Sequence, residues 1–169
     1  TKFFILAITF YGLQTVQGPT QAVRVVSQLI HATDWLPGHV HMGTMGWVTL
    51  TACASVYYVI PKIHGTTIYS EKIANIHFWL VLVGQLLFSV TMWITGIQQG
   101  ALWKAANADG TLTYAFVESV KATYPFYAIR LLGGTMFLAG MLIMAYNMVR
   151  TMAGGKAFDA PIPAVPAHA

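Results

Sequence analysis

Four long apolar runs are the feature that most constrains the fold of this chain. They cover residues 2–16, 36–60, 73–102 and 125–152. An α-helix needs about 20 residues to cross the hydrocarbon core of a bilayer, so the last three runs are long enough and the first is short. Charged residues make up only 8% of the sequence, whereas soluble domains carry roughly 25%. The sequence therefore predicts an all-α membrane protein, with four transmembrane helices in residues 1–152.

The segments between and after these runs have different characters. Residues 21–31 and 114–121 alternate apolar and polar side chains at helical spacing, so both are expected to be short helices lying along a membrane surface. Residues 153–169 are rich in Pro and Ala, so this tail is expected to be extended or disordered. The chain starts at Thr1, inside an apolar run, and we expect it to be part of a longer protein.

The distribution of charge and cysteine removes several classes of function. The nine Lys and Arg residues form no basic run, which argues against nucleic-acid binding. Cys53 is the only cysteine, so no internal disulfide can form. If the loop at residues 62–72 is cytoplasmic, five of the nine cations lie on that side and four on the other. The positive-inside rule therefore gives this orientation a slight preference.

Two histidines, His39 and His41, lie in the first turns of the second apolar run. Positions i and i+2 of an α-helix are about 200° apart, so the two imidazoles leave opposite faces. One metal ion cannot take both, because chelation from a helix needs i, i+3 or i, i+4 spacing. Two cofactors, one on each side of the helix, can. On residue positions alone this reading competes with two hydrogen-bonded packing histidines.

The surroundings of these histidines resemble one family closely. The matching segments follow in order from Phe10 to Val149, and they include Phe10-Tyr11-Gly12, Gly18-Pro19, His31-Ala32-Thr33-Asp34-Trp35, Gly38-His39-Val40-His41, His77-Phe78-Trp79-Leu80, Met92-Trp93 and Tyr124-Pro125-Phe126-Tyr127. The chain resembles the catalytic subunit of the cbb3-type (C-family) haem–copper cytochrome c oxidases. That subunit has about a dozen membrane helices, so the chain would correspond to its C-terminal third.

The resemblance implies a role for five residues. His39 would be the axial ligand of a high-spin haem b, and His41 one of two axial ligands of a low-spin haem b. His31 would hydrogen-bond a propionate of the high-spin haem, and Arg130 would be a second propionate partner. Gln17 stands where the family commonly has Glu close to the high-spin haem and its histidine. Because the amide lacks the carboxylate's charge, we expect weaker donation from the imidazole to the iron and a raised haem potential.

The resemblance also implies the function of the whole subunit. It would belong to a terminal respiratory oxidase of the bacterial inner membrane, reducing O2 to water with electrons from cytochrome c and translocating protons. Membrane-anchored c-type cytochrome subunits would be partners. The copper ligands would lie in earlier helices, so this fragment would be inactive alone. A nitric oxide reductase of the same superfamily and a haem-free membrane scaffold stay as alternatives. His64, His77 and His168 are not expected to be ligands.

Overall fold

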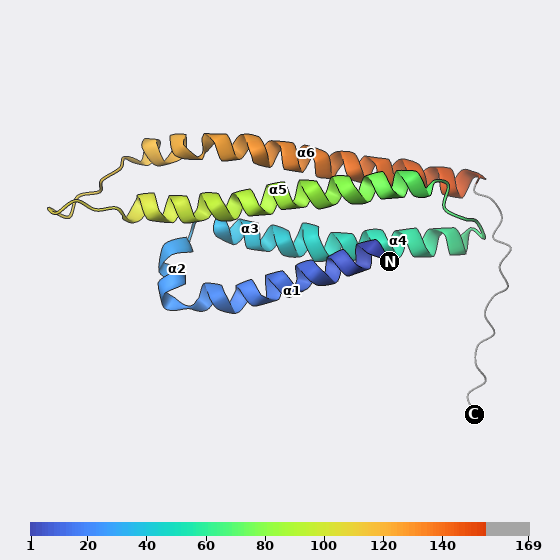
Figure 1. The fold of residues 1–169 in the computed structure, drawn as a ribbon, viewed down its shortest axis with the longest axis horizontal. Coiled ribbons are helices and arrows are strands. Elements are labelled where there is room, and N and C mark those ends of the chain that lie inside the picture. The colour runs from blue at the N-terminus through green and yellow to red at the C-terminus, as the bar shows by residue number, and fades with distance from the viewer. Residues whose placement is uncertain (155–169) are drawn as a thin grey trace, which may run out of the picture.

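The structure is a computed structural model that describes residues 1–154, and nearly all of these residues are helical (Figure 1). A π-helix, η1, continues directly from one α-helix into the next. The elements are α1 (Lys2–Ala22), α2 (Arg24–Ile30), α3 (Trp35–His41), η1 (Met42–Val48), α4 (Thr49–Ile63), α5 (Glu71–Lys104) and α6 (Phe116–Gly154). The all-α class predicted from the sequence is confirmed.

Within residues 1–154, three helical stretches are long and apolar enough to cross a membrane. They are Trp35–Ile63, Glu71–Lys104 and Phe116–Gly154. The first of the four apolar runs, residues 2–16, lies in α1. This helix has 21 residues, but its mean hydropathy is lower than that of the three stretches above. The difference comes from the second half of α1, where polar side chains recur at Gln14, Thr15, Gln17, Thr20 and Gln21.

The two expected surface helices have different outcomes. The first, expected at residues 21–31, corresponds to α2, which begins at Arg24 after an extended residue at Val23. The second does not exist as a separate helix, because residues 116–121 form the first turns of α6, which runs on through Pro125. A proline removes one helical hydrogen bond, but membrane helices tolerate it where other groups satisfy the freed carbonyl. Ala153 and Gly154 complete α6, and the rest of the expected tail lies outside the described residues.

The long helices are stacked side by side in the order α6, α5, the α3–η1–α4 helix and α1 (Figure 1). Glycines let neighbouring helices come into backbone contact. A Cβ atom built on Gly84 of α5 would lie 2.7 Å from the carbonyl oxygen of Gly133 on α6, and the reverse distance is also 2.7 Å. A Cβ atom on Gly38 would lie 2.8 Å from the Trp93 ring of α5. These contacts fix α3 and α6 against opposite sides of α5.

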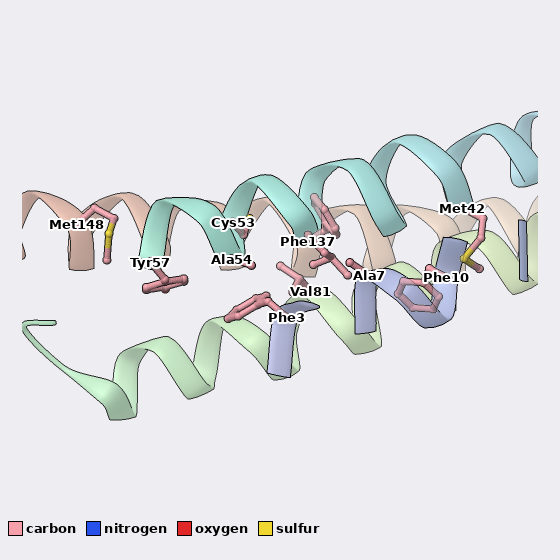
Figure 2. Packing of buried hydrophobic residues seen from close by; sticks show 11 residues of the cluster. Phe3, Ala7, Phe10, Met42, Cys53, Ala54, Tyr57, Val81, Phe137 and Met148 are labelled. Atoms are coloured by element: carbon pink, nitrogen blue, oxygen red, sulfur yellow. The ribbon is translucent and has the colours of Figure 1, made fainter. Parts of the chain in front are cut away.

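Apolar side chains from α1, the α3–η1–α4 helix, α5 and α6 meet in one core (Figure 2). From α1, Phe3, Ala7 and Phe10 point inward and are buried. The same cluster contains Leu50 and Cys53 of α4 and Val81 of α5. This core holds α1 against the bundle despite its polar second half, and it thereby sets which side chains of α1 reach the helix that carries His39.

Candidate functional site

The start of α3 is fixed by hydrogen bonds before the two histidines are reached. The backbone N–H of Asp34 donates to Gln99 Oε1 at 2.8 Å, and the N–H of Trp35 donates to Thr33 Oγ1 at 3.3 Å. Pro37 lies in the first turn, where proline is tolerated because its missing N–H would have no helical partner. The backbone that presents His39 and His41 is therefore anchored to α5.

His41 is half-buried, and its side chain is oriented by its own helix. Its Nδ1 lies 2.6 Å from the carbonyl oxygen of Pro37. A carbonyl oxygen can only accept, so Nδ1 carries the proton, and in the neutral ring the free lone pair is on Nε2. The imidazole ring lies 5.0 Å from the ring of Phe88 on α5. The imidazole of His41 therefore lies against α5, and Nε2 is the ring nitrogen suited to bind a metal.

His39 is also half-buried and turns toward a different helix. Its Nδ1 lies 3.3 Å from Oε1 of Gln17 on α1. If the amide oxygen accepts this hydrogen bond, Nε2 is again the free nitrogen.

Glycines allow α1 to approach the helix that carries His39. A Cβ atom on Gly43 would overlap the side chain of Gln14, and one on Gly46 would lie 3.1 Å from Phe10. The prediction that the two imidazoles leave opposite faces agrees with His39 meeting α1 and His41 meeting α5.

The helix changes its winding immediately after His41. Residues Met42–Val48 form the π-helix η1, and its wider turn is seen where the N–H of Thr49 donates to the carbonyl of Thr44, five residues earlier. π-helical turns are rare and frequently occur at functional sites. The sequence does not distinguish η1 from an α-helix, since the apolar pattern of residues 42–48 fits an α-helix equally well.

A groove with a single cationic side chain lies beside His41. Its volume is about 650 Å³, and it is lined by Phe88, Tyr127, Arg130, Leu131, Gly134, Thr135 and Leu138. Phe88 forms part of the wall and also contacts the His41 ring. The groove therefore offers an apolar surface with one cation, next to an imidazole whose Nε2 is free. An apolar ring system that carries carboxylates would match both properties.

Arg130 is held at this groove by Asp34, a residue that sequence analysis did not single out. Arg130 Nη1 lies 2.9 Å from Asp34 Oδ2, and the two side chains are 23% and 22% exposed. The guanidinium carbon also lies 5.5 Å from the centre of the Phe88 ring and 5.3 Å from that of Tyr127. Arg130 thus lies near His41, with Phe88 between them, and it is bound to a carboxylate from the start of α3.

The remaining histidines are placed differently. His31 follows α2, with its side chain exposed. His64 is exposed at the end of α4, and His168 lies outside the described residues. His77 is fully buried, and its Nδ1 lies 3.1 Å from the hydroxyl of Tyr57. His77 therefore packs in the core and hydrogen-bonds to α4.

The donor set limits what kind of metal group could bind. Nowhere in residues 1–154 do three His, Cys, Asp or Glu side chains gather in a way that could hold a metal ion. A metal bound by His39 or His41 must therefore obtain most of its ligands from another source. Haem supplies four equatorial nitrogens of its own and needs only axial ligands from protein. The single free Nε2 of each histidine fits that requirement.

Comparison with known proteins identifies the family. Residues 1–136 match the family model described as cytochrome c and quinol oxidase polypeptide I. The chain is 45% identical over 156 residues, 92% of its length, to the cbb3-type cytochrome c oxidase subunit CcoN1 of Stutzerimonas stutzeri. It is 43% identical over 154 residues, 90% of its length, to a cytochrome c oxidase subunit 1 homolog of Agrobacterium tumefaciens. The aligned regions make up 33% and 29% of those two relatives.

The fold is shared with a solved structure. The chain superimposes with a TM-score of 0.70 on a heme-copper terminal oxidase dimer determined by cryo-EM. The match covers 92% of this chain and 27% of that one, at 20% identity. The chain thus spans about a third of the length of the relatives it matches, and the resemblance drawn from the residues around His39 and His41 is confirmed. The chain belongs to the cytochrome c and quinol oxidase polypeptide I family.

Proposed function

We propose that this chain is the haem-holding, C-terminal part of the catalytic subunit of a terminal oxidase. His39 would bind the iron of a high-spin haem b and His41 the iron of a low-spin haem b. The observation that carries the proposal is the opposed orientation of the two imidazoles. One is held by Gln17 on α1, while the other is held by the Pro37 carbonyl and faces α5.

The proposed role of this chain is to hold the two haems and to orient them. The hydrogen bond at each Nδ1 fixes the ring and selects the tautomer in which Nε2 can bind iron. Arg130 would neutralise a propionate beside the groove, and His31 would donate to a propionate on the other haem. When bound, the haems supply one-electron exchange and, at the high-spin site, O2 binding. Because only Val40 separates the two histidines, an electron would have a short protein bridge to cross.

The whole subunit would act in a larger assembly. The activity proposed for it is reduction of O2 to water by electrons from cytochrome c, coupled to proton translocation across a bacterial inner membrane. Membrane-anchored c-type cytochrome subunits would deliver the electrons. Copper would be bound by residues outside this chain, in the remainder of the catalytic subunit. The three membrane-capable helices support a membrane location.

A reduced-minus-oxidised optical spectrum and haem extraction on the intact complex test this proposal. We expect two haem b groups, one of which changes its spectrum when carbon monoxide is added. A complex without haem b would refute it and leave the membrane scaffold. Gln17 in place of the family's Glu departs from the oxidase pattern, which leaves room for a second candidate, a nitric oxide reductase of the same superfamily. Steady-state turnover of O2 and of nitric oxide by the same complex decides between the two.

A further inference from the structure

We propose that Asp34 is a positioning residue, which holds the guanidinium of Arg130 beside His41 and so helps to set the reduction potential of the haem bound there. This inference rests on the proposed function, because it needs a haem at His41. It concerns a residue that touches neither the proposed iron nor its histidine. Its effect would be transmitted through Arg130, to which its carboxylate is bound.

The geometry makes Asp34 a bridge between three helices. Its backbone N–H donates to Gln99 Oε1 of α5 at 2.8 Å. Its carboxylate oxygen Oδ2 accepts from Arg130 Nη1 of α6 at 2.9 Å. Asp34 itself immediately precedes α3, five residues before His39. The position of the cation on α6 is therefore tied to the backbone that starts the histidine-bearing helix.

The surroundings make the ion pair more consequential than a surface pair. Exposed pairs contribute little because water and salt screen them. Here both side chains are about one-fifth exposed, and the aromatic rings of Phe88 and Tyr127 lie beside the guanidinium. The guanidinium has five N–H donors, and the hydrogen bond to Asp34 uses one of them. Asp34 can thus fix the direction of Arg130 and leave donors free for a carboxylate in the groove.

Asp34 affects the reduction potential of a nearby haem in two ways, and both lower it. A negative charge close to a haem favours the oxidised, more positive iron and lowers the reduction potential. Arg130 released from Asp34 would move toward the haem carboxylate and raise the potential. Asp34→Asn should therefore raise the potential of the low-spin haem by both routes. A charge-neutral change is needed to separate positioning of Arg130 from the direct field of Asp34.

Gln99→Met provides that change. It removes the oxygen that accepts the Asp34 N–H but alters no charge, so it loosens the support of the ion pair without changing the local field. The same bond anchors the start of α3, so a general loosening of that helix would also change the potential of the high-spin haem bound at His39. The matched control is Gln98→Met, since Gln98 is the adjacent glutamine on α5, and its side-chain oxygen has no hydrogen-bond partner within residues 1–154. Asp109→Asn serves as the charge control, because Asp109 lies in the exposed turn between α5 and α6, where its carboxylate binds Thr111.

The experiment is an optical redox titration of both haems in the intact complex carrying each variant. We expect the ratio of reduced to oxidised low-spin haem at fixed potential to rise severalfold in Asp34→Asn, where tenfold corresponds to about 59 mV for one electron. A smaller rise in Gln99→Met, with no change in either control or at the high-spin haem, supports the proposal. A shift in Asp34→Asn without one in Gln99→Met would overturn it, and so would no shift in either. Absence of haem b from the wild-type complex would instead refute the proposed function.

Discussion

Two regions of this helix bundle hold their histidines in different environments. At the start of the α3–η1–α4 helix, His39 and His41 are half-buried, each with Nδ1 in a hydrogen bond and Nε2 free to bind. In the first turns of α5, His77 is 0% exposed, and its Nε2 is enclosed without a hydrogen-bond partner in residues 1–154. All three have an engaged Nδ1. Access to Nε2, rather than burial in a membrane helix, therefore distinguishes a candidate ligand from a packing histidine.

The largest effect should come from removing a proposed ligand. His41→Ala takes away the nitrogen that would bind the low-spin iron, so we expect complete loss of that haem's spectral bands from the intact complex. His39→Ala should remove the haem that responds to carbon monoxide instead. Haem extraction and reduced-minus-oxidised spectra measure both losses.

The residue between the two histidines gives a matched control. Val40 is 52% exposed and offers no nitrogen, so Val40→Ala should retain both haems. Unchanged spectra in His41→Ala would show that this histidine is not a ligand, and the contrast with His77 would then have no functional meaning.

The second prediction concerns the backbone contact between α5 and α6. A Cβ atom on Gly133 would lie 2.7 Å from the Gly84 carbonyl oxygen and 2.9 Å from the Phe88 nitrogen, both backbone atoms that cannot rotate away. We expect Gly133→Ala to destabilise the complex by roughly 1–3 kcal/mol, the usual cost of overpacking. The apparent melting temperature of the purified complex in detergent measures the loss.

The neighbouring glycine is the control for this change. A Cβ atom on Gly134 would lie 3.6 Å from the Phe88 ring, which is an ordinary contact. Gly134→Ala should therefore leave the melting temperature unchanged or raise it slightly, since alanine favours the helix. Equal destabilisation by both substitutions would mean that α5 and α6 can separate at this point without cost.

A third prediction tests the buried hydrogen bond between His77 and Tyr57. His77→Phe removes one partner of the buried Tyr57 hydroxyl, which also interacts with the Asn147 side chain. A fully unsatisfied buried hydroxyl costs about 1–3 kcal/mol, so the loss should lie toward the lower end of that range. We expect a lower melting temperature but unchanged spectra of both haems. The double variant Tyr57→Phe/His77→Phe should recover part of the stability, because replacing both partners by apolar rings leaves nothing unsatisfied. Loss of a haem in His77→Phe would contradict the packing role.

The membrane helices and the opposed directions of His39 and His41 could both be predicted from the sequence alone. A membrane-crossing helix must satisfy its own backbone, so apolar runs of sufficient length predict helices with few alternatives. The geometry of an α-helix likewise requires His39 and His41 to point to opposite sides. Those two facts are local, and they needed no knowledge of how the helices pack.

Three features could not be predicted because they depend on packing. The ion pair joins Asp34 and Arg130, which are 96 positions apart, and no local pattern links them. The π-helix η1 has the same apolar sequence character as an α-helix. The first turns of α6 resembled a separate surface helix, because Pro125 is usually a sign that a helix ends.

The smallest predicted effect concerns the hydrogen bond that orients His39. Gln17 presents a neutral acceptor 3.3 Å from Nδ1. Gln17→Glu would replace it with a carboxylate that strengthens the imidazole as a donor and stabilises the oxidised iron, so the potential of the high-spin haem should fall. A redox titration of the intact complex measures the shift, with Gln14→Glu as control, because Gln14 lies against Gly43 rather than against His39. Equal shifts in both variants would indicate a general field effect. A potential that does not fall in Gln17→Glu would show that this side chain only positions the ring. The bond at Nδ1 of His39 would then be purely structural, like the bond between His77 and Tyr57.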